Sequence, residues 1–180
     1  VVCGGTVNLT AVAAGCKPLN NNFNGGDMTM GGTQPWQSTN GATVQNGTGS
    51  HACVGPPSEG AYSVWMGTTV AAPRSITTNG YDMTQCSATS ATICFDMKYG
   101  TQGGSSPCEG IDLPAEGVSI QYNTGSGWVT LQYWDPNGGY DPSLTTWNRY
   151  CISLPPAAMT TSTQFRWYQS QSSGAGFDAW

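Results

Sequence analysis

Glycine and proline interrupt this sequence too often for a long amphipathic helix to form. The chain has 180 residues, of which 25 are glycine and 11 are proline. Glycine destabilises helix interiors through its backbone freedom, and proline does so through its missing N–H. No window of about 11 residues keeps an apolar period of about 3.6 without such a breaker or a β-branched residue. We therefore expect any helices to be single turns.

Short alternating or apolar runs, each bounded by turn residues, predict β-strands instead. These runs are residues 6–13, 60–67, 74–83, 92–100, 117–124, 127–134, 148–155 and 163–170. A chain of this length fits one medium domain with a single core. So many short strands in one domain predict an all-β sandwich.

The clearest local prediction is a β-hairpin over residues 118–134. Val118, Ile120 and Tyr122 alternate with polar residues, as a half-buried strand requires. The sequence TGSG then turns the chain into WVTLQYW, residues 128–134. In this second strand the even-numbered residues are expected on one face and the odd-numbered residues on the other.

The chain carries few charges, and most of them are acidic. Charged residues make up 8% of the sequence, with five Lys and Arg against ten Asp and Glu. Affinity for nucleic acids comes largely from counterion release by basic groups, so we exclude nucleic acid as a partner. The longest apolar runs fall far short of the roughly 20 residues that span a bilayer, so we expect no membrane insertion. The Thr-, Ser-, Asn- and Gly-rich composition suits an extracellular β protein. No leader opens the sequence, and we expect it to be a piece of a longer chain.

The cysteines predict disulfides rather than a zinc site. There are seven: Cys3, Cys16, Cys53, Cys86, Cys94, Cys108 and Cys151. They lack the C-x-x-C spacing of zinc ribbons, and the single histidine, His51, cannot complete a Cys/His cluster. Disulfides indicate an oxidising compartment. A local bridge between Cys3 and Cys16 is expected, the remaining connectivity stays open, and the odd count leaves at least one thiol unpaired or bonded outside this chain.

From residue 92 onward the order of motifs resembles the reelin subrepeat. TICFDMKYG is followed by a Gly/Ser-rich loop, EGVSIQYNTGSGWVTLQYW, RYCISLP and FRWYQS with GFDAW. The positions that carry the resemblance hold Glu116, Gln121, Tyr122, Trp128, Phe165, Arg166, Trp167, Gln169 and Asp178. The resemblance extends over residues 95–180, is weaker over 23–91 and is absent before residue 16. Similar units occur in large bacterial surface proteins, including the adhesins of gliding and type IX-secreting bacteria.

The resemblance implies a jelly-roll β-sandwich of the galactose-binding-like kind, with a structural calcium ion held near its last strand. The expected ligands are Asn24 and Asp27 in NNFNGGDM, together with Asp178 in GFDAW. The alternative is that Asn24 and Asp27 are ordinary turn residues and that Asp178 caps a loop. Family members continue past the residue that matches Trp180, so we expect this chain to be truncated within its last strand.

A second possible calcium loop is DPNGGYDP, which places Asp135, Asn137 and Asp141 at alternate positions. An EF-hand would also need a glutamate where this chain has Thr146. We therefore interpret this segment as a polar connection between strands.

Two further features could bind a ligand. Arg166 lies between aromatic residues, and on an alternating strand we expect it to stack on rings or to pair with a carboxylate. Trp36, Trp65, Trp134 and Trp147 could form a sugar-stacking platform, although the core is the expected place for any single tryptophan.

No catalytic arrangement is apparent, and we expect no enzyme. Glycoside hydrolysis needs two carboxyl groups about 5–10 Å apart across a cleft. The carboxyl groups nearest in sequence, Glu109, Asp112 and Glu116, belong to one Pro-containing loop. His51 lies in a turn-like stretch without the G-x-S-x-G elbow.

The expected function is that of a noncatalytic extracellular module in a large secreted or cell-surface adhesin. It would act as a calcium-stabilised spacer, scaffold or protein-binding domain between neighbouring domains. The alternative is a carbohydrate-binding module that recognises a cell-surface glycan on the same sandwich. Residues 1–180 would form one domain, with residues 1–22 as an N-terminal strand extension or linker.

Overall fold

The computed structural model describes most of the chain, and only the backbone of residues 7–10 and 20–21. The described residues are 7–10, 20–21, 23, 26, 28, 35–46, 60–67, 70–86, 89, 91–101, 109–136 and 141–180. These segments contain β-strands and 3₁₀ turns, which confirms the expected absence of long helices there. Within these segments, no helix combines the length and the apolar character needed to cross a membrane.

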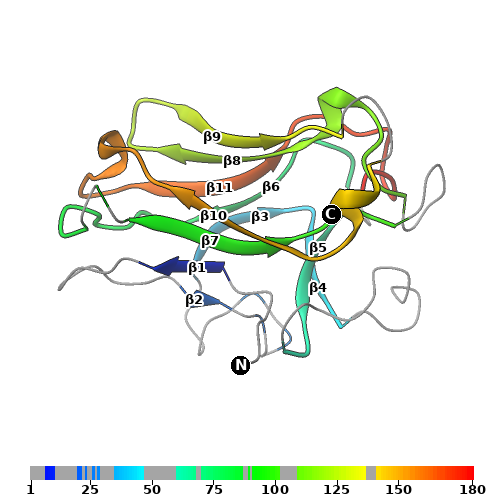
Figure 1. Cartoon of the computed structure of the whole chain (residues 1–180), viewed down its shortest axis with the longest axis horizontal. Coiled ribbons are helices and arrows are strands. Elements are labelled where there is room, and N and C mark those ends of the chain that lie inside the picture. Colours follow the sequence, from blue (N-terminus) through cyan, green and yellow to red (C-terminus); the bar gives the residue numbers. More distant parts are fainter. Residues whose placement is uncertain are drawn as a thin grey trace.

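A five-stranded antiparallel sheet forms one layer of the fold (Figure 1). In spatial order its strands are β3 (Trp36–Asn40), β6 (Arg74–Thr78), β11 (Gln164–Gln169), β8 (Val118–Asn123) and β9 (Trp128–Trp134). The central strand β11 pairs with β6 on one side and with β8 on the other. Its residues Phe165, Trp167 and Gln169 are buried, as expected when one face of a sheet covers a core.

A four-stranded sheet and a two-stranded ribbon complete the described strands. The four strands are β10 (Asn148–Ser153), β7 (Thr92–Met97), β1 (Val7–Thr10) and β2 (Asn20–Asn21), in that spatial order. The ribbon pairs β4 (Ala42–Gln45) with β5 (Ser63–Met66). All eight runs that predicted strands contain one in the structure.

The core lies between the two larger sheets and is rich in aromatic rings. Phe95 of β7 meets Trp167 of β11 edge-on at 5.2 Å between ring centroids, and Trp134 of β9 at 5.5 Å. All three side chains are at most 7% exposed. Because rings from both sheets meet in one cluster, the structure confirms the predicted all-β sandwich.

The predicted hairpin forms as β8 and β9, but a β-bulge changes the faces of β9. Val118, Ile120 and Tyr122 are buried, as predicted. The register shifts between Ile120 and Gln121, which pair with Gln132 and Thr130. Trp128 and Thr130 therefore do not alternate in step with the residues of β9 that follow the bulge. The strict alternation expected for residues 128–134 is therefore wrong in its second half.

Strands β3 and β4 are absent from the sequence-based prediction. Strand β3 is rich in Gln, Ser and Thr, and β4 has only four residues; Gly41, at a φ of 81°, joins the two strands. This turn separates strands of different sheets: β3 pairs with β6, whereas β4 pairs with β5. Only glycine adopts this φ without strain.

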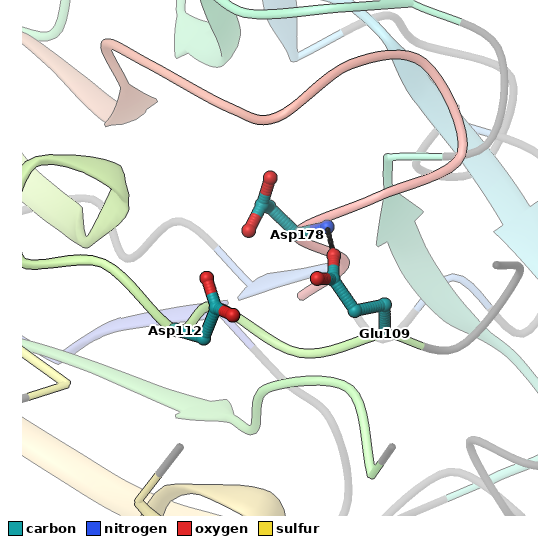
Figure 2. A group of neighbouring side chains, drawn as sticks. All are labelled: Glu109, Asp112 and Asp178. Atoms are coloured by element: carbon teal, nitrogen blue, oxygen red, sulfur yellow. Dashed lines mark hydrogen bonds between the residues drawn. The ribbon is translucent and has the colours of Figure 1, made fainter. Parts of the chain in front are cut away.

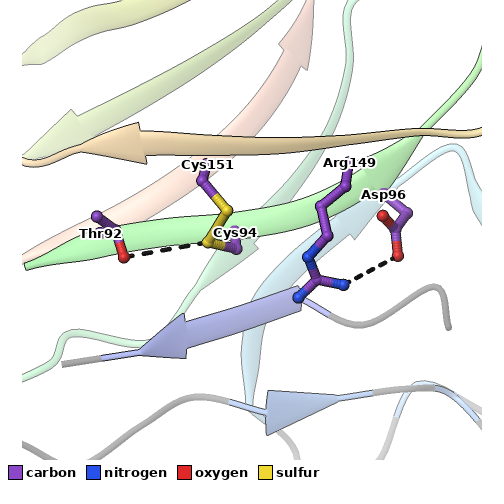
Figure 3. The surroundings of a disulfide bond; sticks show 5 residues. All are labelled: Thr92, Cys94, Asp96, Arg149 and Cys151. Atoms are coloured by element: carbon purple, nitrogen blue, oxygen red, sulfur yellow. Dashed lines mark hydrogen bonds and ion pairs between the residues drawn. A yellow bond between two sulfur atoms is a disulfide. The ribbon is translucent and has the colours of Figure 1, made fainter. Parts of the chain in front are cut away.

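A disulfide joins the two neighbouring strands β7 and β10 (Figure 3). Cys94 and Cys151 are direct cross-strand partners, and beside them Arg149 forms an ion pair of 3.3 Å with Asp96. Cys86 is also disulfide-bonded. These bonds confirm the prediction of disulfides, whereas the expected bridge between Cys3 and Cys16 lies outside the described residues.

The last residues of the sequence connect segments that are distant along the chain. Ala179 donates its N–H to Glu109 O at 2.9 Å and accepts a hydrogen bond from Gly100 N at 2.8 Å. Trp180 and Met66 exchange two main-chain hydrogen bonds, of 3.2 and 2.8 Å. These contacts fix the position of the adjacent residue Asp178.

Candidate metal centre

Three carboxyl groups converge where the loop after residue 108 meets the end of the sequence (Figure 2). Glu109, Asp112 and Asp178 each offer one oxygen, and these oxygens lie within 4.8 Å of one another. Glu109 is held by the bridge between its neighbour Gly110 and Ala179. The cluster therefore combines residues from two separate segments.

Asp178 is held in an unusual backbone conformation at the centre of this cluster. Its φ is 54°, in the left-handed region that non-glycine residues rarely adopt. Its N–H donates to Glu109 Oε2 at 2.8 Å, and its Oδ2 accepts a hydrogen bond from Ser173 N at 2.5 Å. The side chain is fully buried, and its Oδ1 receives no hydrogen bond. A buried carboxylate oxygen without a donor is destabilising unless a proton or a cation compensates it.

A fourth carboxyl group, that of Glu116, lies beside the cluster. Glu116 ends the 3₁₀ helix η2 (Pro114–Glu116) and is 4% exposed. Its Oε1 accepts a hydrogen bond from Ser173 Oγ at 3.0 Å, and its Oε2 accepts one from Leu113 N at 3.2 Å. The side chain is thus fixed by the same turn that bonds Asp178.

Arg74 places a positive charge near Asp178, Glu116 and Glu109, and its side chain is fully buried. Its guanidinium donates to four neutral oxygens: Val70 O at 2.6 Å, Gln169 Oε1 at 2.9 Å, Asp178 O at 2.9 Å and Gly174 O at 2.8 Å. Among the carboxylates of the described segments, none makes a direct ion pair with Arg74. Its charge therefore acts on the cluster only through space.

Gln169 completes the buried polar network. Its amide nitrogen donates to Glu116 O at 2.9 Å and to Asp178 O at 3.1 Å. Its amide oxygen accepts hydrogen bonds from Arg74 Nη1 at 2.9 Å and from Trp180 Nε1 at 3.1 Å. One uncharged side chain thus links strands β6 and β11 to η2 and the last turn.

The site holds more negative than positive charge. Burial raises the pKa values of Glu109, Asp112, Glu116 and Asp178, because it penalises the charged form of each carboxyl group. The nearby negative charge of Asp178 raises the pKa of Glu116 further. Either protons or a cation must therefore balance this site near neutral pH.

The donor set fits a hard divalent cation. Glu109, Asp112 and Asp178 offer only carboxylate oxygens, which calcium and magnesium prefer, whereas zinc sites usually include His or Cys. The buried Asp178 Oδ1 without a donor is the observation that fits an ion best. The arrangement can hold a structural ion, and none of these carboxyl groups lines the apolar pocket beside Trp147 and Trp180.

The structure brings together only part of the predicted ligand set. Asp178 belongs to the cluster, but Asn24 and Asp27 lie outside the described residues, so their role stays a prediction. Glu109 and Asp112 were not predicted as ligands. Their signal was present, because a chain with only ten Asp and Glu places three of them within residues 109–116.

The other candidate residues have structural contacts. Asp141 accepts hydrogen bonds from Ser143 N and Oγ and caps the N-terminus of the 3₁₀ helix η3 (Pro142–Thr145), in agreement with a polar connection. Its predicted companion Asn137 lies outside the described residues. Asp135 is part of the described chain and does not belong to the acidic cluster.

Three of the four tryptophans considered for sugar stacking lie in the core. Trp36, Trp65 and Trp134 are at most 7% exposed, whereas Trp147 is partly exposed. They do not form an exposed row of rings. Arg166 stacks on two aromatic rings, which confirms the expected contact.

The sequence matches one family of known proteins. The family is described as Reelin subrepeat B, and its sequence model matches residues 41–180, well over half of the chain. The chain therefore belongs to the reelin subrepeat B family.

Proposed function

We propose that this reelin subrepeat B domain is a noncatalytic extracellular module that a calcium ion stabilises. It would serve as a spacer, scaffold or protein-binding domain within a large secreted or cell-surface protein, with an adhesin as the expected setting. The observation that carries this proposal is the buried Asp178 Oδ1, which receives no hydrogen bond. Asp178 lies beside two further carboxyl groups, those of Glu109 and Asp112.

Charge balance supports a structural ion at this position. Glu109, Asp112 and Asp178 would hold the ion, and its two positive charges would offset the carboxylates that Arg74 reaches only through space. Because the ligands come from two segments that are 69 residues apart along the chain, an ion would cross-link them only in the folded state. Such an ion stabilises the fold and performs no chemistry.

Two observations support the extracellular setting. The disulfide between Cys94 and Cys151 is of the kind that persists in oxidising compartments. The low content of charged residues, 8% of the chain, agrees with a surface of neutral polar side chains. The spacer role rests on the family membership.

Thermal unfolding with and without a chelator tests the calcium proposal. A ligand present at about 100 times its dissociation constant stabilises the folded state by about 2.7 kcal/mol. We expect calcium, added after EGTA treatment, to raise the unfolding midpoint of the wild-type protein. Asp112→Asn should abolish most of this rise, whereas Asp82→Asn, which removes the same charge from an exposed turn, should keep it. An unchanged midpoint in calcium and in EGTA would refute the proposal.

The carbohydrate-binding alternative needs an exposed surface, which the buried Trp36, Trp65 and Trp134 do not provide. The outer face of the five-stranded sheet offers one, because Trp128 and Tyr168 lie there on either side of Arg166. This observation keeps glycan recognition as a second candidate function.

A further inference from the structure

Arg166 is held in a fixed position on the outer face of the five-stranded sheet. Its Cζ lies 4.1 Å from the centroid of the Trp128 ring and 4.1 Å from that of the Tyr168 ring. Its Nε donates to Gln121 Oε1 at 2.6 Å. Two rings and one hydrogen bond thus orient a planar cation before any ligand arrives.

The terminal nitrogens of this guanidinium remain available. Within the described chain, neither Nη1 nor Nη2 of Arg166 makes a hydrogen bond, and neither is among the buried atoms that lack one. Arg149, on the opposite sheet, differs in this respect because it pairs with Asp96 at 3.3 Å.

The surroundings of Arg166 are polar and uncharged. Arg166 is paired with Gln121, and Gln121 with Thr130, so these three residues form one row across β11, β8 and β9. Gln121 Nε2 donates to Thr130 Oγ1 at 3.1 Å. Gln164 lies two residues before Arg166, on the same face of β11, and is partly exposed. Amide and hydroxyl groups of this kind exchange hydrogen bonds with sugar hydroxyls.

We propose that this row binds an acidic glycan, with the carboxylate of a uronic acid residue on the terminal nitrogens of Arg166. The planar fork of arginine matches a carboxylate with two parallel hydrogen bonds. One cation amid neutral amides and hydroxyls suits a ligand that carries one negative charge per sugar and several hydroxyls. The partly exposed rings of Trp128 and Tyr168 would contact the sugar ring beside that carboxylate. This assignment rests on the second candidate function and is independent of the calcium site.

Calorimetric titration with defined oligosaccharides tests the assignment. The probes are a tetramer of galacturonic acid, its neutral galactose counterpart, a sulfated galactose tetramer and a short polyglutamate. We expect the wild-type protein to bind the uronic acid tetramer in preference to the other three, with an affinity that falls as salt rises. Arg166→Gln should weaken binding at least about tenfold, and Arg166→Lys should also weaken it because lysine lacks the fork. Arg149→Gln serves as the matched control and should bind like the wild type.

Each other outcome contradicts the assignment as a whole or shows which part of it is wrong. No binding of the uronic acid tetramer, or equal binding by Arg166→Gln with an unchanged thermal midpoint, would overturn it. Equal binding of the sulfated sugar or of polyglutamate would show that Arg166 binds anions in general, and the assignment to a uronic acid would be wrong. Binding of the neutral tetramer alone would reject the role of Arg166 while preserving a carbohydrate function. If Arg166→Gln does not fold, the comparison of the four probes on the wild-type protein still decides.

Discussion

Replacement of Gln169 by leucine would test whether the buried polar network stabilises the domain. Gln169 is fully buried and takes part in four hydrogen bonds, two as donor and two as acceptor. Leucine has a similar volume and no charge, so Gln169→Leu removes these bonds with little change in shape. The Glu116 carbonyl would lose its bond from Gln169, whereas Arg74 Nη1 and Asp178 O would keep the bond between them.

The expected loss of stability follows from these contacts. Four hydrogen bonds at about 1 kcal/mol each amount to about 4 kcal/mol, and an orphaned buried acceptor adds to that loss. Burial of the more apolar leucine returns about 1–2 kcal/mol. We therefore expect Gln169→Leu to lower the free energy of unfolding by about 3 kcal/mol, a large part of the stability of an ordinary domain.

Urea unfolding followed by tryptophan fluorescence, in buffer with excess EGTA, would measure this change without interference from a bound metal. A loss of about 3 kcal/mol moves the urea midpoint by about 1.5 M at a typical slope. Gln132→Leu is the matched control: Gln132 is exposed and donates only to the neighbouring Tyr133 O, so a change within about 0.5 kcal/mol is expected. A loss for Gln169→Leu no larger than that of Gln132→Leu would show that the network contributes nothing to stability.

Two further predictions concern the acidic cluster and the disulfide. Burial raises the pKa values of Glu109 and Asp178, so the metal-free folded state binds protons more tightly than the unfolded chain. The thermal midpoint in EGTA should therefore fall as the pH rises from about 5 to about 8, and a midpoint that rises with pH over this range would contradict the assigned charge balance. Joint replacement of Cys94 and Cys151 by alanine opens a loop with a sequence separation of 57 and should lower the free energy of unfolding by about 4 kcal/mol, measured by urea unfolding. A loss below about 1 kcal/mol would mean that the disulfide does not constrain the unfolded chain.

The strands that were predicted from the sequence are those with a local apolar pattern. Residues 118–123 alternate between apolar and polar side chains, and all three apolar members are buried, as is Ser119. Strand β3 lacks this signal because four of its five residues are neutral and polar, and β4 is only four residues long, so their pairing with β6 and β5 identifies them as strands. The bulge opposite Ile120 was equally hidden, because an extra residue in one strand shows only against its partner.

The candidate site was predictable only in part for a similar reason. The family resemblance pointed to Asp178, but Glu109 and Asp112 became candidates only when the chain brought the loop after residue 108 beside the last turn. Glu109 and Asp112 lie too far from Asp178 along the sequence for one local motif to contain all three residues. The role of Arg74 was also beyond sequence reasoning, because a buried arginine that bonds only neutral oxygens follows no pattern of charges.

The long-range contacts of Asp178 determine when this domain can finish folding. The bonds from Asp178 reach back 69 residues to Glu109 and 104 residues to Arg74. Contacts between such distant residues form late and slow the folding of β proteins. During synthesis, the earlier strands emerge long before this aspartate and cannot yet make these contacts. A cation at the cluster would therefore secure only the completed domain and could not rescue a partly emerged one.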